Sequence, residues 1–358
     1  EEGGSQTARY PVSSFQLSYG AEHPEHPPLE ESLVLPIRLG RKGDLWVRPD
    51  EGIQAEEVTL REMNDPAVRV FDAGALRIIH EAVVAEFNRR GLIGVYVMPH
   101  PEDIDKRTLE DLRPKDRTSL RLVVWTSVVS KVRTLASGKR FPDPEERINH
   151  PAHRRIVSHS PLQPAAESEG SPDLLARDDL REYILQLNRF PGRRVDAAVS
   201  SAESAGHVNL DYIVSENRPW LAYAQISNTG TEATDEWRER IGLLCNQLLN
   251  ADDTLTLDYI TAGYGADANA LAFSYDFAVL PVDGLRLRVF ASWSDFEARD
   301  IGAAEEFFTG EGWSAGAEGI YTVFQHNELF VDLMAGARWQ YARDTNETFA
   351  PTVVIEGE

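Results

Sequence analysis

The chain has little of what several protein classes require. Its single cysteine, Cys245, excludes an intrachain disulfide framework and a cysteine-based zinc site. No run of about 18 apolar residues is present, which excludes a transmembrane helix. Basic residues number 36 against 58 acidic ones, and the net charge of −22 argues against a protein that binds nucleic-acid phosphates. No signal peptide is visible at Glu1, which a processed start or a trimmed chain would explain.

The first half of the 358-residue chain contains two units in which a helix precedes alternating strands. The first helix is predicted at 73–90, with Asp72 as N-cap and Gly91 just past its end. Its apolar residues recur at helical spacing. A strand through Val95 and Val97 follows. We therefore predict a mixed α+β domain at 15–112, after a flexible segment at 1–14.

The second unit, predicted at 113–218, opens with one long strand. Leu120, Leu122, Val124, Val128 and Val132 share its face. A loop rich in proline, serine and histidine is expected at 141–173. A helix at 178–189 ends at Pro191-Gly192, and strands follow at 193–200 and 207–216.

From Trp220 onward the pattern changes to long alternating strands joined by short turns, predicting an all-β antiparallel domain at 219–358. Seven strands are expected, with an eighth near 350–357. They are 220–228, 236–246, 253–263, 270–280, 285–296, 314–325 and 328–342. Strands of about ten residues have the length of a membrane-spanning β-strand. Alternation fits both a membrane barrel, polar inside, and a soluble barrel, apolar inside, so it does not decide between them.

Three stretches resemble the two-partner secretion transporters, the haemolysin secretion/activation family. Residues 75–97 are similar to the end of the family's first POTRA domain, with Arg90-Gly91 and Gly94-Val95. Residues 180–216 are similar to the end of its second POTRA domain. Residues 224–253 resemble the opening of its barrel. The matching positions there are Asn228, Gly230, Arg238, Asn246 and Asp253.

The resemblance implies α+β N-terminal POTRA-like domains followed by an all-β antiparallel, partial transmembrane β-barrel. Family barrels have sixteen strands, and the family's Arg-Gly-Tyr type loop has no match here. We therefore expect a C-terminally truncated or divergent protein. An open half-barrel would leave unpaired strand edges in lipid. The alternative is a small closed barrel of about eight strands.

By resemblance, the protein is expected in the outer membrane with its N-terminal domains in the periplasm. It would recognise an unfolded secreted client and pass it through the barrel. An extended client adds readily to a sheet edge, and the candidate edge residues are Val95, Val97, Leu122 and Val124. If the barrel is membranous, a polar set lines the lumen. It comprises Arg238, Arg240, Asp258, Asp276, Arg286, Arg288, Asp332 and Arg338.

Neither an enzyme nor a cofactor is predicted. His23 and His26, and likewise His150, His153 and His159, lie in proline-rich loops without a fixed acidic partner, so we predict no metal site. Other functions remain open: a factor that assembles other outer-membrane barrels, a soluble β-barrel that binds a ligand, or an esterase attached to a barrel.

Overall fold

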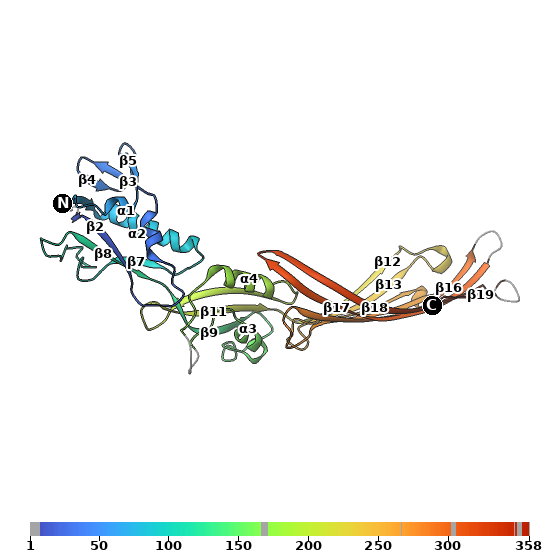
Figure 1. Cartoon of the computed structure of the whole chain (residues 1–358). Helices are drawn as coiled ribbons and strands as arrows, with labels where there is room; N and C mark the ends of the chain where they lie inside the picture. The colour runs from blue at the N-terminus through green and yellow to red at the C-terminus, as the bar shows by residue number, and fades with distance from the viewer. Residues whose placement is uncertain are drawn as a thin grey trace, which may run out of the picture. The chain divides into compact units, whose positions relative to one another are not determined.

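The computed structural model describes residues 8–165, 171–265, 267–301, 306–346, 348 and 353–357 (Figure 1). Contacts divide the chain into two compact units. One comprises residues 1–133, 160–181 and 198–211, and the other residues 134–159, 182–197 and 212–358. No helix among the described residues combines the length and apolar character needed to cross a membrane.

The first domain (residues 8–125) has a three-stranded sheet in the order β2-β8-β7. Its strands are β2 (Ser14–Tyr19), β7 (Tyr96–Pro99) and β8 (Ser119–Trp125). Helix α2 (Ala73–Arg89) buries Leu76, Ile79, Val83 and Phe87, as predicted. Asp72 caps it by accepting a 2.7 Å hydrogen bond from the Ala75 amide. Gly91, at φ 89°, ends it in the left-handed region that favours glycine.

A second sheet of five strands, in the order β1-β6-β4-β3-β5, comes largely from the chain between β2 and α2. Its strands are β1 (Arg9–Val12), β3 (Ile37–Lys42), β4 (Leu45–Val47), β5 (Gln54–Val58) and β6 (Arg69–Asp72). The 3₁₀ helix η1 (Leu29–Val34) and helix α1 (Leu60–Met63) accompany it. Tyr10 and Val12 are buried in the core, so the prediction of a flexible segment is wrong for residues 9–14. Residues 1–7 lie outside the described chain.

The predicted strand through Leu120 and Val132 is two strands in two sheets. β8 ends at Trp125 and completes the first domain, whereas β9 (Val128–Ser137) belongs to the next sheet. The break falls at Thr126-Ser127, where the Ser127 hydroxyl donates to the Gly94 carbonyl at 2.7 Å. The predicted boundary at 112/113 is therefore too early. Apolar residues occur at even positions on both sides of the junction, as at Leu122, Val124, Val128 and Val132, so periodicity carried no clear sign of it.

The second domain (residues 128–216) has a sheet in the order β10-β11-β9. Its other elements are β10 (Arg193–Ser201), β11 (His207–Glu216), η2 (Pro151–His153), α3 (Arg154–Ser158) and α4 (Arg177–Leu187). Strands β10 and β11 and helix α4 match their predicted positions closely. The predicted loop at 141–173 also contains η2 and α3, and Ile156 of α3 is buried.

The last domain is one antiparallel sheet in sequence order, β12 to β19. Its strands are β12 (Trp220–Ser227), β13 (Arg238–Asn246), β14 (Thr254–Ala262), β15 (Ala268–Ala278), β16 (Leu285–Ile301), β17 (Glu306–His326), β18 (Leu329–Asn346) and β19 (Val353–Gly357). Short 3₁₀ turns, η3 (Glu232–Thr234) and η4 (Gly263–Gly265), lie in two of the connections.

All eight predicted strands are present, and β16 and β17 run further than predicted. β12 and β19 end the sheet on either side and do not pair with each other among the described residues. The alternative of a closed eight-stranded barrel is therefore wrong for this structure.

Candidate functional site

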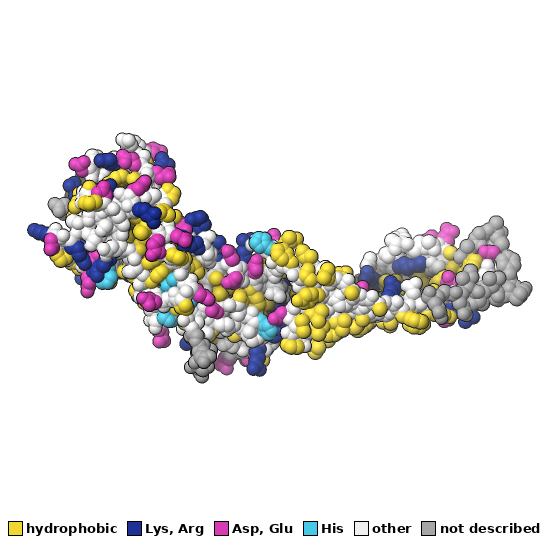
Figure 2. Space-filling view, in the orientation of Figure 1, with side chains coloured by type: hydrophobic (Ala, Val, Ile, Leu, Met, Phe, Trp, Pro, Cys, Tyr) yellow, Lys and Arg dark blue, Asp and Glu magenta, His cyan; other side chains and the backbone are white. Residues whose placement is uncertain are grey.

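The eight-stranded sheet carries an exposed apolar face. The register places the large side chains of alternate positions side by side, as in the row Leu243, Leu257, Phe273, Ala291, Ala315 and Trp339. Leu333 is 63% exposed and Trp339 60%. Figure 2 shows hydrophobic side chains gathered on these strands, whereas the N-terminal domains carry mixed charges. A contiguous apolar face of this extent requires a partner that covers it.

The apolar band ends at one row of the register. Ile241, Tyr259, Leu271, Trp293, Trp313 and Tyr341 lie in line across six strands. The next row on the same face is Glu239, Thr261, Asn269, Asp295, Glu311 and Arg343, which is polar throughout. An aromatic row at the edge of an apolar band is typical of a membrane–water interface. On β16 the band covers residues 285–293, close to the length of about 9–11 residues that a spanning strand needs.

The opposite face is polar, and it carries all eight predicted lumen residues. Arg240 Nε donates to Asp258 at 2.8 Å. Arg286 Nε donates to Asp276 at 2.7 Å, and Arg288 donates to the same carboxylate at 3.2 Å. Alternation along the strands brings these charges together, and mutual pairing lowers the cost of placing them on one surface. Their place in a lumen remains a proposal.

The other three predicted residues have different partners. Arg238 donates to the carbonyls of Thr234 and Asp235, within its own hairpin connection. Arg338 donates weakly to the Ser314 hydroxyl at 3.4 Å. Asp332 pairs with Arg189, which follows helix α4 in the second domain. Sequence reasoning missed Arg189, because no local pattern links a helix end to a strand more than a hundred residues later.

Of the four residues predicted to bind the client at a sheet edge, only Val97 lies on an edge strand. Leu122 and Val124 are fully buried in β8, the central strand of its sheet, and cannot receive an added strand. Val97 lies on β7, which is an edge strand, and Val95 is buried just before it. Since the His100 amide donates to Arg121 in β8, alternation points the Val97 amide away from the sheet. Pro99 has the same outward orientation but no amide hydrogen. This edge therefore offers few outward-pointing backbone amides to which an added strand could bond.

Strand β10 is a longer edge that the sequence analysis did not single out. The Ala202 amide donates to His207 across the β10–β11 turn, so alternation turns the odd-numbered groups of β10 outward. The Asn188 side chain already bonds the Val195 amide and carbonyl, both at 2.7 Å. The outward-pointing backbone groups of residues 197–201 lie beyond the contact with Asn188, and Val199 is exposed. The alternation of residues 193–200 does predict a strand. It does not show that this strand lies at the edge of its sheet, because strand order is set by the tertiary structure.

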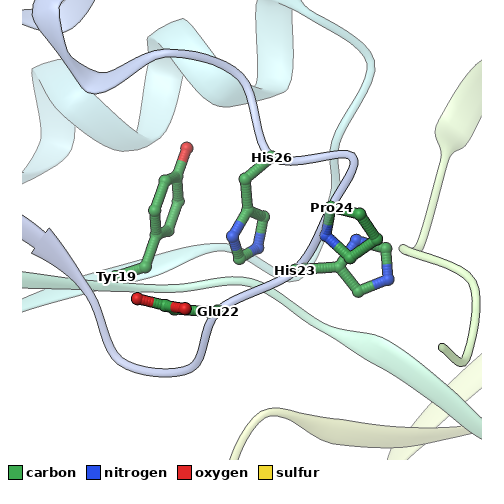
Figure 3. Close-up of a pocket in the computed structure, with 5 residues that line it drawn as sticks. All are labelled: Tyr19, Glu22, His23, Pro24 and His26. Atoms are coloured by element: carbon green, nitrogen blue, oxygen red, sulfur yellow. The ribbon is translucent and has the colours of Figure 1, made fainter.

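The two histidines of the first proline-rich loop line a pocket of about 450 Å³ with Tyr19, Glu22 and Pro24 (Figure 3). The His26 ring stacks on Tyr19 with centroids 3.8 Å apart. Burial, with a smaller contribution from His23, lowers the pKa of His26 to about 4. One ring nitrogen of each histidine already contacts the protein, His26 at Thr126 and His23 at the Pro172 carbonyl. Within the described residues, no group of three acidic, histidine or cysteine side chains is arranged to hold a metal.

A buried ionic cluster lies at the end of β11, just before β12 begins. Glu216 accepts a 2.9 Å hydrogen bond from Arg140, and His153 Nε2 lies 3.4 Å from the same carboxylate oxygen. Arg140 also donates to the Gln247 carbonyl at 3.1 Å and to the Asn250 side chain. Burial alone would raise the pKa of Glu216, but its bonds and charge attraction with His153 and Arg140 outweigh burial and lower it.

This cluster predicts a loss of stability in acid. Because the folded-state pKa of Glu216 is lowered, its contribution is present above the unfolded value of about 4.3 and is lost as pH falls through the folded pKa. We expect the thermal midpoint of the wild-type protein to fall towards that of Glu216→Gln below about pH 4.3. Thermal unfolding of both proteins from neutral to acidic pH measures this. A difference that stays constant with pH would contradict it.

Part of the chain matches a known protein family. Residues 206–343 match the model of the family described as haemolysin secretion/activation protein ShlB/FhaC/HecB. The heme/hemopexin transporter protein HuxB of Haemophilus influenzae strain 86-028NP is 24% identical over 140 residues, which are 37% of this chain and 24% of that protein. The chain thus aligns with about a quarter of the length of this curated relative.

The fold of the chain is similar to that of a solved structure. CdiB from Escherichia coli matches with a TM-score of 0.50 at 14% identity, over 99% of this chain and 54% of that one. CdiB from Acinetobacter baumannii matches with a TM-score of 0.42 at 11% identity, over 96% of this chain and 55% of that one. The prediction of POTRA-like domains followed by a partial β-barrel is confirmed as the fold. From the β10–β11 turn to the last long strand, residues 206–343 are thus similar to the haemolysin secretion/activation family, the two-partner secretion transporters.

Proposed function

We propose that this protein secretes a partner exoprotein across the outer membrane. The observation that carries the proposal is the two-faced sheet, whose exposed apolar band ends at an aromatic row and whose other face holds paired charges. Lipid covers the apolar face. The polar face lines the path of the client, and the N-terminal domains lie in the periplasm. Binding and folding of the client outside supply the driving force, and the protein catalyses no reaction.

The family match supports secretion over barrel assembly, the second candidate. To test this, the proteins of the culture medium and of the outer membrane are compared with and without the full-length protein. Secretion predicts that one exported protein disappears from the medium while other outer-membrane barrels stay at their normal level. A general loss of outer-membrane barrels would instead identify an assembly factor. Recovery of the protein in the soluble fraction would contradict both.

Client recognition is proposed to use the β10 edge, because its outward backbone at 197–201 accepts an extended segment as an added strand. Val199→Pro removes an outward amide without removing a bond of the existing ladder. We expect Val199→Pro to weaken binding of the unfolded client to the full-length protein about tenfold, since hydrogen bonds in an added strand supply much of the affinity.

Val199→Ala is the matched control, because it shortens the same side chain and keeps the amide. Affinity is measured by titrating a labelled client segment. Equal affinity of the proline and alanine variants would show that the client binds elsewhere. Val97→Pro tests the shorter β7 edge in the same assay.

A further inference from the structure

The second domain meets the sheet at the turn between β13 and β14, residues 247–253. Arg140 donates to Gln247 and Asn250, and Arg193 pairs with Asp252 at 2.7 Å. Arg286 donates to the Asp252 carbonyl at 2.6 Å. Arg193 and Gln247 are almost completely buried. Charged groups buried with their partners are costly to separate, so this attachment is a fixed one.

A different contact lies a short way along the polar face. The loop between α4 and β10, residues 188–192, extends over that face. Arg189 donates to Thr322 at 2.9 Å and to Asp332 at 3.2 Å, and its guanidinium lies 4.6 Å from the Phe330 ring. The Phe190 ring covers the guanidinium of Arg286 at 3.9 Å. The loop therefore occupies the polar face above Asp332 and Arg286, at the sheet end where the chain arrives from the second domain.

The contact between Arg189 and Asp332 is one that can break and form again. The Arg189 side chain is 24% exposed and that of Asp332 22% exposed, so water reaches both partners. When they separate, each charge is hydrated, and Thr322 still donates to Asp332 at 2.8 Å. Separating a partly exposed ion pair costs less than separating a buried one, because water solvates the released charges. The contact between Arg189 and Asp332 is therefore easier to break than the buried contacts of the 247–253 turn.

We propose that the α4–β10 loop is a gate on the polar face, held closed by Arg189 on Asp332 and by Phe190 on Arg286, while the 247–253 turn stays attached. The proposal rests on the proposed function, since it names a step within secretion. A client passing along the polar face displaces Arg189 from Asp332 and lifts the loop. The buried contacts of Arg140 and Arg193 act as the hinge.

The test joins the loop to the sheet covalently. The full-length protein carries Arg189→Cys, Asp332→Cys and Cys245→Ala and is treated in cells with a bifunctional methanethiosulfonate, which a reducing agent removes. We expect the crosslink to abolish export of the partner and reduction to restore it. The matched control carries Arg77→Cys, Glu81→Cys and Cys245→Ala. This pair lies within α2 and is exposed, so the same reagent should leave export unchanged.

The outcomes separate the gate from the function. If wild-type protein exports no partner, the proposed function fails. If wild-type protein exports and the 189–332 crosslink does not reduce export, the gate is overturned and the function stands. An independent measurement is the probability that the channel of the Asp332→Asn variant is open in planar lipid bilayers. Its open probability should rise about tenfold, and the swap Arg189→Asp with Asp332→Arg should return it towards the wild-type value. Wild-type open probability in Asp332→Asn would also overturn the gate.

Discussion

Leu257→Arg is expected to destabilise the membrane-inserted protein by about 2–4 kcal/mol, because an arginine would lie near the middle of the apolar band that we propose faces lipid. Leu257 is exposed on β14, in register with Leu243 and Phe273. The same substitution on the surface of a soluble protein would change the free energy of unfolding by no more than about 0.5 kcal/mol. The loss of stability caused by Leu257→Arg therefore distinguishes a face covered by lipid from a face exposed to water.

Thr256→Arg is the matched control, because Thr256 is the preceding residue of the same strand and lies on the polar face. Both variants are refolded into lipid vesicles and unfolded with denaturant. We expect a large loss of stability for Leu257→Arg and a small one for Thr256→Arg. Equal effects would show that neither face contacts lipid and would remove the basis of the proposed function.

Asp103→Ala is expected to destabilise the first domain by about 1.5–3 kcal/mol, because it removes a buried carboxylate that accepts hydrogen bonds from two partly exposed arginines. Asp103 is completely buried. It accepts bonds from the Arg121 amide at 2.9 Å and from Arg121 Nε at 3.1 Å, and it pairs with Arg117. Burial alone would raise the pKa of Asp103, but the bonds from Arg121 and the charges of Arg121 and Arg117 lower it. The carboxylate thus stays ionised at neutral pH and ties the 100–118 loop to β8.

Hydrogen exchange of the full-length protein measures this effect locally. Amides of β8 and of the 100–118 loop should exchange faster in Asp103→Ala, while those of the eight-stranded sheet keep their rates. Asp116→Ala, an exposed acidic residue of the same loop, serves as the control and should behave as wild type. Unchanged exchange in Asp103→Ala would show that the ionic network does not stabilise the domain.

Several elements were predictable because their signals are local. Helix α2 was placed correctly by its capping Asp72, its apolar spacing and Gly91. The strands of the last domain were found by alternation, and their two faces followed from the same period of two. That period also placed Asp258 with Arg240, and Asp276 with Arg286, on one face.

The five-stranded sheet of the first domain was not predictable in the same way. β1 pairs with β6 across nearly sixty residues, and β4 pairs with β6 in parallel, so no turn signal joins these partners. Short strands such as β4, three residues long, carry too few alternations to stand out. The division of residues 119–137 between two sheets was missed for a related reason, because apolar residues occur at even positions on both sides of Ser127, as at Val124 and Val128.

By itself, the sequence determined the two helix-and-strand units, the eight alternating strands and the separation of apolar from polar faces. These depend on backbone periods and on burial, which each segment encodes in its own residues. Only the tertiary structure decided strand order, which makes β8 central and β10 an edge. It also decided the ending of the apolar band at one row across six strands, and the pairing of Arg189 with Asp332. Each of these depends on contacts between distant segments, whose partners no local pattern specifies.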